Sequence, residues 1–424
     1  MLSIPQDSGC GRRLGERRAP RYQVHSVNVG YSMQAESALS LPAPDAVSDA
    51  HSRAVEAFIA GQVRDNGGFI SFAEFMQHAL YAPGLGYYVC GKTKFGPDGD
   101  FVTAPEVSSL FGRVVALQIA PTLKELGDAD VLEVGAGSGK LAVDVLKKLA
   151  ELDALPLRYR ILEVSPELAA RQREMLAQRV PALAERVEWL ADWPAAFRGV
   201  VLANEVLDAL PAERFRRDVD GVSQLGVTLE AGRLVAATRP APPLLESDVL
   251  AIENELGSRF PPDYVSETAP AVSHWVSDLA AHLDSALVLL LDYGLPQSDY
   301  YAPDRNLGWL RCHFRHRAHD NPLILPGIQD ITAWVDFSRV AHAGVDAGLT
   351  LAGYLPQAQF LLHGGLAEEL AAAGPDAALA LPREIKLLTL PGEMGEHFKA
   401  MGFVTGTDVR APAVFAKADH SHRL

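Results

Sequence analysis

A short apolar run that ends in three alternating glycines and leads into a helix constrains this chain most. Residues 129–134 have the pattern of a strand, Gly135, Gly137 and Gly139 follow at every second position, and a helix is expected from Leu141. Glycine permits a tight turn and lets backbone N–H groups approach a ligand closely. The pattern therefore predicts a ligand site between a strand and a helix, although such a turn also serves simple strand–helix packing.

The spacing of these glycines separates three classes of ligand site. A phosphate-binding P-loop would need a glycine at Val134 and a serine or threonine at Leu141, so it fails twice. A dinucleotide fingerprint would need its third glycine at Lys140, so it fails once. The actual pattern, Glu133-x-Gly135-x-Gly137-x-Gly139, resembles the first motif of class I S-adenosylmethionine methyltransferases.

Further apolar runs at 159–164, 186–190, 199–203 and 286–291 alternate with helical segments. Strands that alternate with helices predict parallel βαβ units and a sheet covered on both faces. We therefore expect the α/β class: a doubly wound, Rossmann-like methyltransferase sheet with an N-terminal helical region and two large insertions that form a smaller substrate-side subdomain.

The chain divides into seven expected segments. These are a disordered, arginine-rich leader over 1–48, an N-terminal helical region with a cofactor-covering loop over 49–125, the first part of the core over 126–211, an insertion over 212–285, a core strand over 286–294, a substrate-side extension over 295–380, and the C-terminal completion of the core with a tail over 381–424. Within the insertion we expect a hairpin and helices over 244–256 and 267–283.

Charge and composition exclude some functions. The 38 basic and 53 acidic side chains give a net charge of -15, whereas a nucleic-acid-binding protein usually carries a basic surface. A negative net charge is compatible with a basic peptide as partner. No apolar run is long enough to span a membrane.

Three scattered cysteines suit a reducing compartment and lack zinc-site spacing, so no metal is expected. A cytoplasmic location is expected, with the mitochondrial matrix as the alternative if the leader is a transit peptide. The sequence predicts no oligomeric state.

The methyltransferase motif implies roles for acidic residues after the other strands. Glu163 ends the second strand, where dinucleotide folds place an acid that binds the ribose hydroxyls, and Asp192 after the third strand is placed to meet the adenine amino group. Asp100 and Thr103 are expected in the loop that covers the cofactor. The expected cofactor is S-adenosylmethionine.

More of the chain looks familiar beyond the glycine turn. The segments that carry this resemblance are Gly86-Tyr87-Tyr88, 99–106 (GDFVTAPE), Phe111-Gly112, 204–211 (NEVLDALP), 291–294 (LDYG), 316–319 (HRAH), Pro326-Gly327, 329–332 (QDIT) and 335–337 (VDF). In this order, over roughly 50–403, they resemble the MidA family, whose mitochondrial members include a complex I assembly factor that acts as a protein arginine methyltransferase. One departure is Trp309, where the family usually has threonine.

This resemblance implies a protein substrate that presents an arginine, and a possible link to respiratory complex assembly. Asn204 and Glu205 follow the fourth strand, where open α/β sheets place their reacting groups. An arginine methyltransferase needs carboxylates to bind the planar guanidinium and assist proton loss. We therefore expect Glu205 as guanidinium clamp, Asn204 as a positioning group near the methyl donor, and Asp208 beside them, unless Asp208 only caps a turn.

Four further residues are candidate substrate contacts. They are Tyr88, His316, His319 and Asp336. The two histidines are either proton carriers or structural; their spacing matches a metal pair on a helix face, but Pro322 argues against a helix there. Asp336 is either a substrate contact or an acid at a helix start. Two other functions remain open: a small-molecule methyltransferase, and a non-catalytic assembly factor that binds the cofactor.

Overall fold

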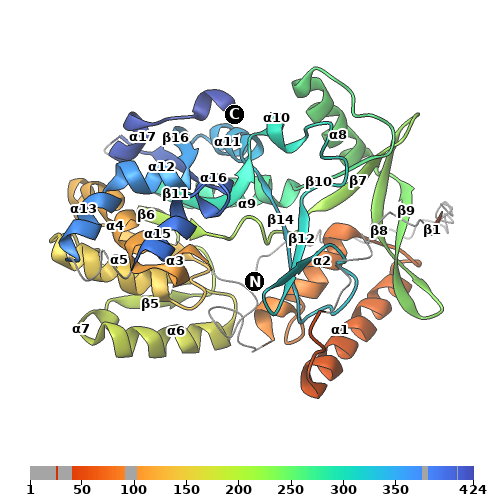
Figure 1. Ribbon diagram of the computed structural model, residues 1–424, viewed down its shortest axis with the longest axis horizontal. Coiled ribbons are helices and arrows are strands. Elements are labelled where there is room, and N and C mark those ends of the chain that lie inside the picture. The colour runs from red at the N-terminus through yellow and green to blue at the C-terminus, as the bar shows by residue number, and fades with distance from the viewer. Residues whose placement is uncertain (1–24, 27–40, 91–102, 375–380, 408) are drawn as a thin grey trace, which may run out of the picture.

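The computed structural model describes residues 25–26, 41–90, 103–374, 381–407 and 409–424. A large α/β part carries most of the helices, and a smaller part built mainly from antiparallel strands lies beside it (Figure 1). The fold class expected from the sequence is confirmed. None of the helices in these described ranges combines the length and the apolar character needed to cross a bilayer.

The main sheet has the strand order β16-β17-β11-β6-β3-β4-β5, with the short β15 paired to β11. Its strands are β3 (Asp130–Val134), β4 (Tyr159–Leu162), β5 (Val187–Leu190), β6 (Phe197–Asn204), β11 (Leu283–Leu295), β15 (Val335–Asp336), β16 (Thr350–Pro356) and β17 (Phe398–Thr405). The neighbours β11, β6, β3, β4 and β5 run parallel, and β17 is antiparallel to both of its neighbours. All five strands predicted from the glycine turn onward are present.

Both faces of this sheet are buried, which explains why its strands have continuous apolar runs. Val131 and Val200 point into one core with α4, α5 and α12, while Leu132 and Val201 point into the other with α9 and α11. The helices around the sheet are α3 (Ala104–Val107), α4 (Ser109–Leu126), α5 (Lys140–Glu151), α6 (Pro166–Arg179), α7 (Pro181–Ala184), α9 (Pro270–Ala281), α11 (Phe337–Asp346), α12 (Gln357–Gly364), α13 (Leu366–Ala372), α15 (Pro382–Thr389), α16 (Met394–His397), α17 (Ala413–Lys417) and the 3-10 turn η2 (Ser421–Arg423).

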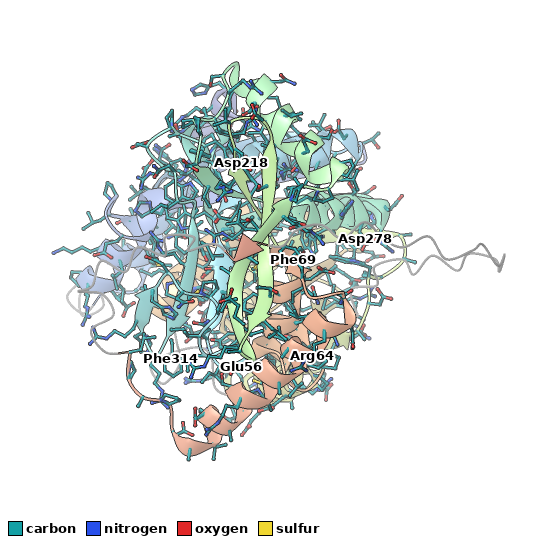
Figure 2. The ribbon with its side chains drawn as sticks, turned by 90° about the vertical axis from the view of Figure 1, so that its right-hand side faces the viewer. Glu56, Arg64, Phe69, Asp218, Asp278 and Phe314 are labelled. Atoms are coloured by element: carbon teal, nitrogen blue, oxygen red, sulfur yellow. The ribbon has the colours of Figure 1, made fainter. Side chains whose placement is uncertain are left out.

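The smaller part contains a six-stranded antiparallel sheet in the order β1-β9-β8-β7-β10, with β2 paired to β8. Its elements are α1 (Ala46–Asp65), α2 (Phe72–Tyr81), η1 (Tyr87–Val89), α8 (Pro243–Leu256), β1 (His25–Ser26), β2 (Ile70–Ser71), β7 (Glu213–Arg217), β8 (Val222–Glu230), β9 (Arg233–Pro240) and β10 (Tyr264–Thr268). Figure 2 faces this part and shows strands crossing its middle near Phe69, with Glu56 and Arg64 of α1 beside them. A capping box formed by Ser71 and Glu74 begins α2.

The sequence underestimated the strands of the 212–285 insertion. A hairpin was expected, but β7, β8 and β9 form a three-stranded meander, and β10 adds a fourth strand. The helix predicted over 267–283 begins only at Pro270. Glu267 lies instead in β10, because its buried carboxylate accepts from the Arg214 side chain of neighbouring β7 at 2.9 Å.

The 295–380 extension also divides differently from the expectation. Its first half is separate from the main sheet: α10 (Gln297–Tyr300) and the three-stranded sheet of β12 (Leu310–Phe314), β13 (Arg317–His319) and β14 (Asp330–Ala333). From Val335 onward the chain returns to the core, because β15 pairs with β11 and β16 pairs with the later strand β17. The departure at Trp309 is accommodated, since its ring stacks on Trp334 with centroids 4.3 Å apart.

The expected leader, 1–48, contains two described pieces of structure. His25–Ser26 pairs with β9, and α1 begins at Ala46, three residues before the expected start of order. The earlier start follows from Asp45, whose carboxylate accepts from the backbone N–H groups of Val47 and Ser48 and so caps the helix.

Candidate active site

A cavity opens at the carboxyl ends of β3, β4 and β6, where open α/β sheets bind their ligands. The glycine turn and the tip of β4 form one side, and the turn after β6 forms the floor. Tyr81 and Tyr88 from the smaller part and Thr103, Pro105 and Glu106 around α3 complete the wall. The cavity therefore joins residues from three of the expected segments, 49–125, 126–211 and 212–285.

The glycine turn has the backbone that its sequence predicts. Gly135, Gly137 and Gly139 have φ values of 65°, 55° and 86°, in the left-handed region that disfavours side chains. Gly135 and Gly137 line the cavity. Gly139 does not; it begins α5, and a Cβ there would lie 3.4 Å from the Gln172 side chain, so its contribution is close packing.

Glu133 lies at the base of this turn and lines the cavity with a side chain that is almost wholly buried, 2% exposed for the residue. The Tyr159 hydroxyl donates to its Oε2 at 2.6 Å. Burial raises the pKa of Glu133 to about 7, and the tyrosine contact opposes that rise. The carboxyl is thus held in a single orientation at the edge of the cavity.

Glu163 follows β4 and lines the cavity, as expected for a group that binds a diol. Its carboxylate accepts from the Ser165 backbone N–H at 2.9 Å and from Gln172 Nε2 at 2.9 Å. The same Gln172 amide donates to the Gly137 carbonyl at 3.0 Å, and its Oε1 accepts from Trp189. Gln172 therefore connects Glu163 to the glycine turn. Sequence reasoning missed this role, because the burial of this polar side chain on α6 is visible only in the structure.

Asp192 does not take the position expected of it. It is exposed and accepts from the backbone N–H of Trp193, and it is absent from the residues that line the cavity. Trp193 lines the cavity instead, held by a 2.8 Å bond from its Nε1 to Asp278 and by an edge contact to Trp275. The path of the chain after β5 thus directs an aromatic ring rather than a carboxylate toward the cavity.

The turn after β6 brings Asn204, Glu205 and Asp208 together on the cavity floor. Glu205 has φ of 52°, a left-handed conformation that costs a non-glycine residue about 1–2 kcal/mol. Asn204 Nδ2 donates to Glu205 Oε1 at 3.1 Å. Burial first, and then the negative charge of Asp208, raise the pKa of Glu205 to about 8.

The two carboxylate oxygens of Asp208 differ in their hydrogen bonds. The Tyr293 hydroxyl donates to Oδ2 at 2.6 Å, whereas Oδ1 is buried without a partner among the described residues. Asn204 Oδ1 is likewise buried and without a partner in the described part of the chain. Burial raises the pKa of Asp208 to about 6. Two unmatched acceptors beside the Glu205 carboxyl form a site that favours a ligand with several N–H donors.

Two tyrosines face this floor. Tyr88, expected as a substrate contact, lines the cavity and donates from its hydroxyl to Asp330 Oδ1 at 2.9 Å. Tyr81, which sequence reasoning missed, lies beside it with the rings stacked at 5.5 Å, and its hydroxyl donates to the Ala209 carbonyl at 3.0 Å. Thr103, expected in the covering loop, also lines the cavity, whereas Asp100 lies outside the described residues.

The remaining candidates lie away from this cavity. His316 is exposed in the two-residue turn between β12 and β13 with φ of 60°, and His319 lies on β13 opposite Cys312, so the pair occupies a hairpin and not a helix face. Asp336 caps α11, where its Oδ1 accepts from the backbone N–H groups of Ser338 and Arg339. Of the two interpretations for Asp336, the structure favours the helix-start acid.

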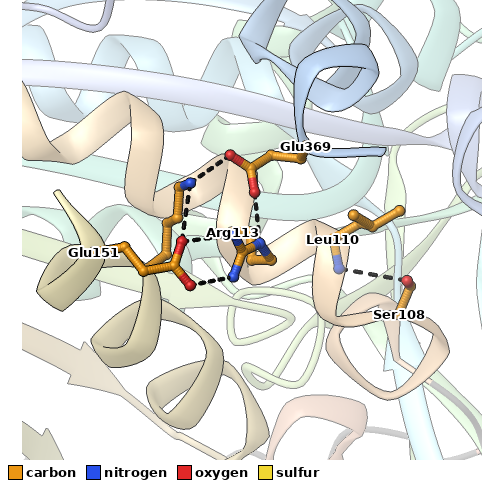
Figure 3. Close-up of polar contacts among 6 residues, drawn as sticks. Ser108, Leu110, Arg113, Glu151 and Glu369 are labelled. Atoms are coloured by element: carbon orange, nitrogen blue, oxygen red, sulfur yellow. Dashed lines mark hydrogen bonds and ion pairs between the residues drawn. The ribbon is translucent and has the colours of Figure 1, made fainter. Parts of the chain in front are cut away.

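Ion pairs anchor α4, the helix that directly follows the segment that supplies Thr103 and Glu106. Figure 3 shows Arg113 of α4 between Glu151 of α5 and Glu369 of α13, at 2.7 and 2.5 Å. Lys148 of α5 also contacts Glu369 at 2.6 Å. Ser108 caps α4 directly after α3, so this cluster holds the helix that follows the cavity-lining residues Pro105 and Glu106.

Comparisons with known proteins relate this chain to methyltransferases. A family described as putative S-adenosyl-L-methionine-dependent methyltransferases matches residues 114–355. Two solved structures from Burkholderia thailandensis superimpose on this chain. One, described as a likely methyltransferase bound to S-adenosyl-homocysteine, has 41% identity and a TM-score of 0.86, covering 91% of this chain and 100% of that one. The other, without that ligand in its description, has 42% identity and a TM-score of 0.83 over the same shares.

Curated relatives share most of the length of this chain. A Drosophila melanogaster homologue of the mitochondrial protein arginine methyltransferase NDUFAF7 is 29% identical over 93% of this chain and 95% of its own length. The Danio rerio protein arginine methyltransferase NDUFAF7 is 30% identical over 78% and 82%. Both relatives are described as mitochondrial, so they do not support the cytoplasmic location expected from the sequence.

Proposed function

This chain belongs to the family of S-adenosyl-L-methionine-dependent methyltransferases, and we propose that its acceptor is an arginine side chain of a protein. The observation that carries this proposal is the pair of acids on the cavity floor, Glu205 and Asp208, with one Asp208 oxygen that has no partner among the described residues. The relatives named as protein arginine methyltransferases point to the same class of acceptor.

The residues around the glycine turn fit the cofactor. Gly135 and Gly137 leave room for the amino-acid end, Glu163 presents a carboxylate to the two ribose hydroxyls, and Trp193 offers an aromatic surface to the adenine. Glu163 is already oriented by Ser165 and Gln172, so little ordering is required when a ligand binds. When bound, S-adenosylmethionine supplies a methyl group activated by attachment to a positively charged sulfur.

The floor of the cavity suits a guanidinium. Arginine presents five N–H donors in one plane, and carboxylates bind this fork in pairs of parallel hydrogen bonds. The Asp208 Oδ1 and Asn204 Oδ1 atoms are acceptors without partners in the described residues. Glu205 adds a carboxyl beside them, whose Oε1 accepts from Asn204 Nδ2. A cation beside Glu205 stabilises its ionised form, so arginine binding lowers its raised pKa and releases a proton.

The chain's own residues then orient the reacting nitrogen and receive a proton. Hydrogen bonds to Glu205 and Asp208 concentrate the positive charge of the guanidinium on the nitrogens they hold, which leaves the remaining nitrogen a better nucleophile. That nitrogen forms its bond to the methyl carbon as the carbon–sulfur bond breaks, and it loses one proton. Glu205, once ionised by the bound cation, is the group placed to accept this proton. The methylated side chain keeps its single positive charge.

The test combines transfer with product identification. The purified chain is incubated with S-adenosylmethionine carrying a labelled methyl group and a pool of arginine-containing peptides, and the acid hydrolysate is analysed for methylarginine. We expect labelled methylarginine from this pool and none from the same pool with lysine at every arginine. Glu205→Gln should lower the rate by about a hundredfold or more, in the range that general acid–base groups contribute.

Glu246→Gln is the matched control, because Glu246 is an exposed glutamate on α8 away from the cavity. It should transfer methyl groups at the wild-type rate. Labelled lysine or a labelled small molecule, with no methylarginine, would refute the arginine proposal and favour a different acceptor. Cofactor binding without any transfer would favour a binding protein over an enzyme.

A further inference from the structure

The end of β11 contacts the reacting turn through two consecutive residues whose roles the proposed function leaves open. Asp292 is buried, 1% exposed, and its Oδ2 accepts from the backbone N–H groups of Val206 at 3.1 Å and Leu207 at 2.9 Å. The N–H of Asp208 points to the same oxygen at 3.4 Å. Three successive backbone N–H groups of the turn that carries Glu205 thus point to one carboxylate oxygen.

The next residue, Tyr293, contacts the side chain of that turn. Its hydroxyl donates to Asp208 Oδ2 at 2.6 Å, and its ring packs between Trp334 and Phe398. The Tyr293 backbone N–H in turn donates to Asp292 Oδ1 at 2.9 Å. The two side chains are therefore coupled, one to the backbone of the turn and the other to its second acid.

We propose that Asp292 and Tyr293 are positioning residues of the transfer reaction. Asp292 holds the backbone of the turn so that Glu205 projects into the cavity, and Tyr293 engages one oxygen of Asp208 so that the other faces the acceptor. The identity of the acceptor in this inference rests on the proposed function. The geometry assigned to Asp292 and Tyr293 rests only on the contacts described above.

The backbone conformation of Glu205 explains why such support is required. A left-handed non-glycine residue persists only where its surroundings determine the conformation strongly. The Glu205 N–H donates to the Leu291 carbonyl at 2.8 Å, directly before Asp292, so the strained residue is held from both sides by β11. Without the Asp292 carboxylate, the N–H groups of Val206 and Leu207 would lose their acceptor, and the turn would be free to relax.

Tyr293 has a second effect, on the charge of Asp208. A hydroxyl that donates to a carboxylate favours its ionised form and lowers its pKa, against the burial that raises it to about 6. The other titratable groups near Asp208 are Glu205, Asp292, Asp330, Tyr81 and Tyr88. None of these groups is a cation, so the ionised form of Asp208 is favoured by hydrogen bonds, first the one from the Tyr293 hydroxyl and then those from the Asp208 and Ala209 backbone.

The experiment uses Tyr293→Phe, which keeps the ring packing and removes only the hydroxyl. Tyr354→Phe is the matched control, because Tyr354 is also buried but its hydroxyl has no partner among the described residues and lies outside the cavity lining. The full chain is labelled with 13C at aspartate carboxyl carbons, and Asp208 is identified by its loss in Asp208→Asn. We expect the Asp208 titration midpoint to rise by about one pH unit in Tyr293→Phe and to stay unchanged in Tyr354→Phe.

Methyl transfer gives the second measurement. If ionised Asp208 binds the acceptor, the acid limb of the kcat/KM profile for arginine peptides moves to higher pH by the same amount in Tyr293→Phe, and kcat falls about tenfold. Asp292→Asn, which keeps the size of the side chain but weakens the acceptor, should lower kcat with little change in the Kd for S-adenosylmethionine.

The outcomes separate the two proposals. Identical Asp208 titration curves in wild type and Tyr293→Phe would overturn the positioning role of Tyr293, whether or not arginine is the acceptor. A shifted titration together with no methylarginine from the wild type would overturn the proposed function alone. Wild-type kcat in a folded Asp292→Asn variant would overturn the role of Asp292.

Discussion

Replacing Glu205 with glutamine should stabilise the folded chain at alkaline pH while it slows methyl transfer about a hundredfold or more. The folded-state pKa of Glu205 is about 8, against 4.5 for a free glutamate, because the carboxyl is buried beside Asp208. The folded state therefore binds this proton more tightly than the unfolded state, and the wild type loses stability as pH rises from about 4.5 to about 8. Glutamine has the same shape and no ionisation, so the variant escapes this loss.

The magnitude follows from the size of the pKa shift. At 1.36 kcal/mol per unit, a shift from 4.5 to about 8 corresponds to at most about 5 kcal/mol above pH 8. Glu205 borders an open cavity whose water screens its charge, so we expect roughly 2 kcal/mol. For 424 residues the entropy of unfolding is about 0.9 kcal/mol per degree, which makes this roughly 2 °C in Tm.

Scanning calorimetry of wild type and Glu205→Gln between pH 5 and pH 9 measures the effect. The Tm difference should grow by about 2 °C across this range in favour of the variant, while Glu246→Gln, at an exposed site, follows the wild type at every pH. A Tm difference that does not change with pH would refute the reasoning, because it would mean that Glu205 ionises as readily in the folded chain as in the unfolded one.

Three further predictions concern the cofactor side of the cavity and are measured by isothermal titration with S-adenosylmethionine. Gly137→Val places a β-branched residue at φ of 55° and should raise the Kd more than a hundredfold, whereas Glu205→Ala should bind as the wild type does; equal losses in both would contradict the separation of the two sites. Glu163→Gln removes the charge that accepts the ribose hydroxyls and should raise the Kd about tenfold, or about 1.4 kcal/mol; an unchanged Kd would remove Glu163 from the site. Trp193→Ala should raise the Kd by a similar factor and leave kcat at saturating cofactor unchanged, and a wild-type Kd would mean that the ring does not contact the adenine.

Local patterns in the sequence were sufficient to predict the central strands of the main sheet and the residues on one side of the cavity. The glycine turn, Glu163 and Glu205 each directly follow a strand, and the carboxyl ends of parallel strands meet at one edge of a sheet, so their proximity follows from chain order. Capping residues such as Ser71 and Ser165 also begin helices where their local sequence predicts.

The edge of the sheet and the rest of the cavity depended on contacts between distant segments. β16 pairs with β17, which lies more than forty residues later, and no local pattern identifies that partner. Asp192 and Trp193 are adjacent, so only the path of the chain after β5 decides which side chain lines the cavity.

Likewise, the sequence places Asp208 near Glu205, but only the packing of β11 against β6 brings Asp292 and Tyr293 onto that turn. The sequence by itself determined the cofactor class and the acids on the cavity floor, because both depend on residues close together along the chain. The tertiary structure alone decided which groups hold those acids in place, because a side chain's partners depend on strand pairing and side-chain direction, which sequence spacing does not encode.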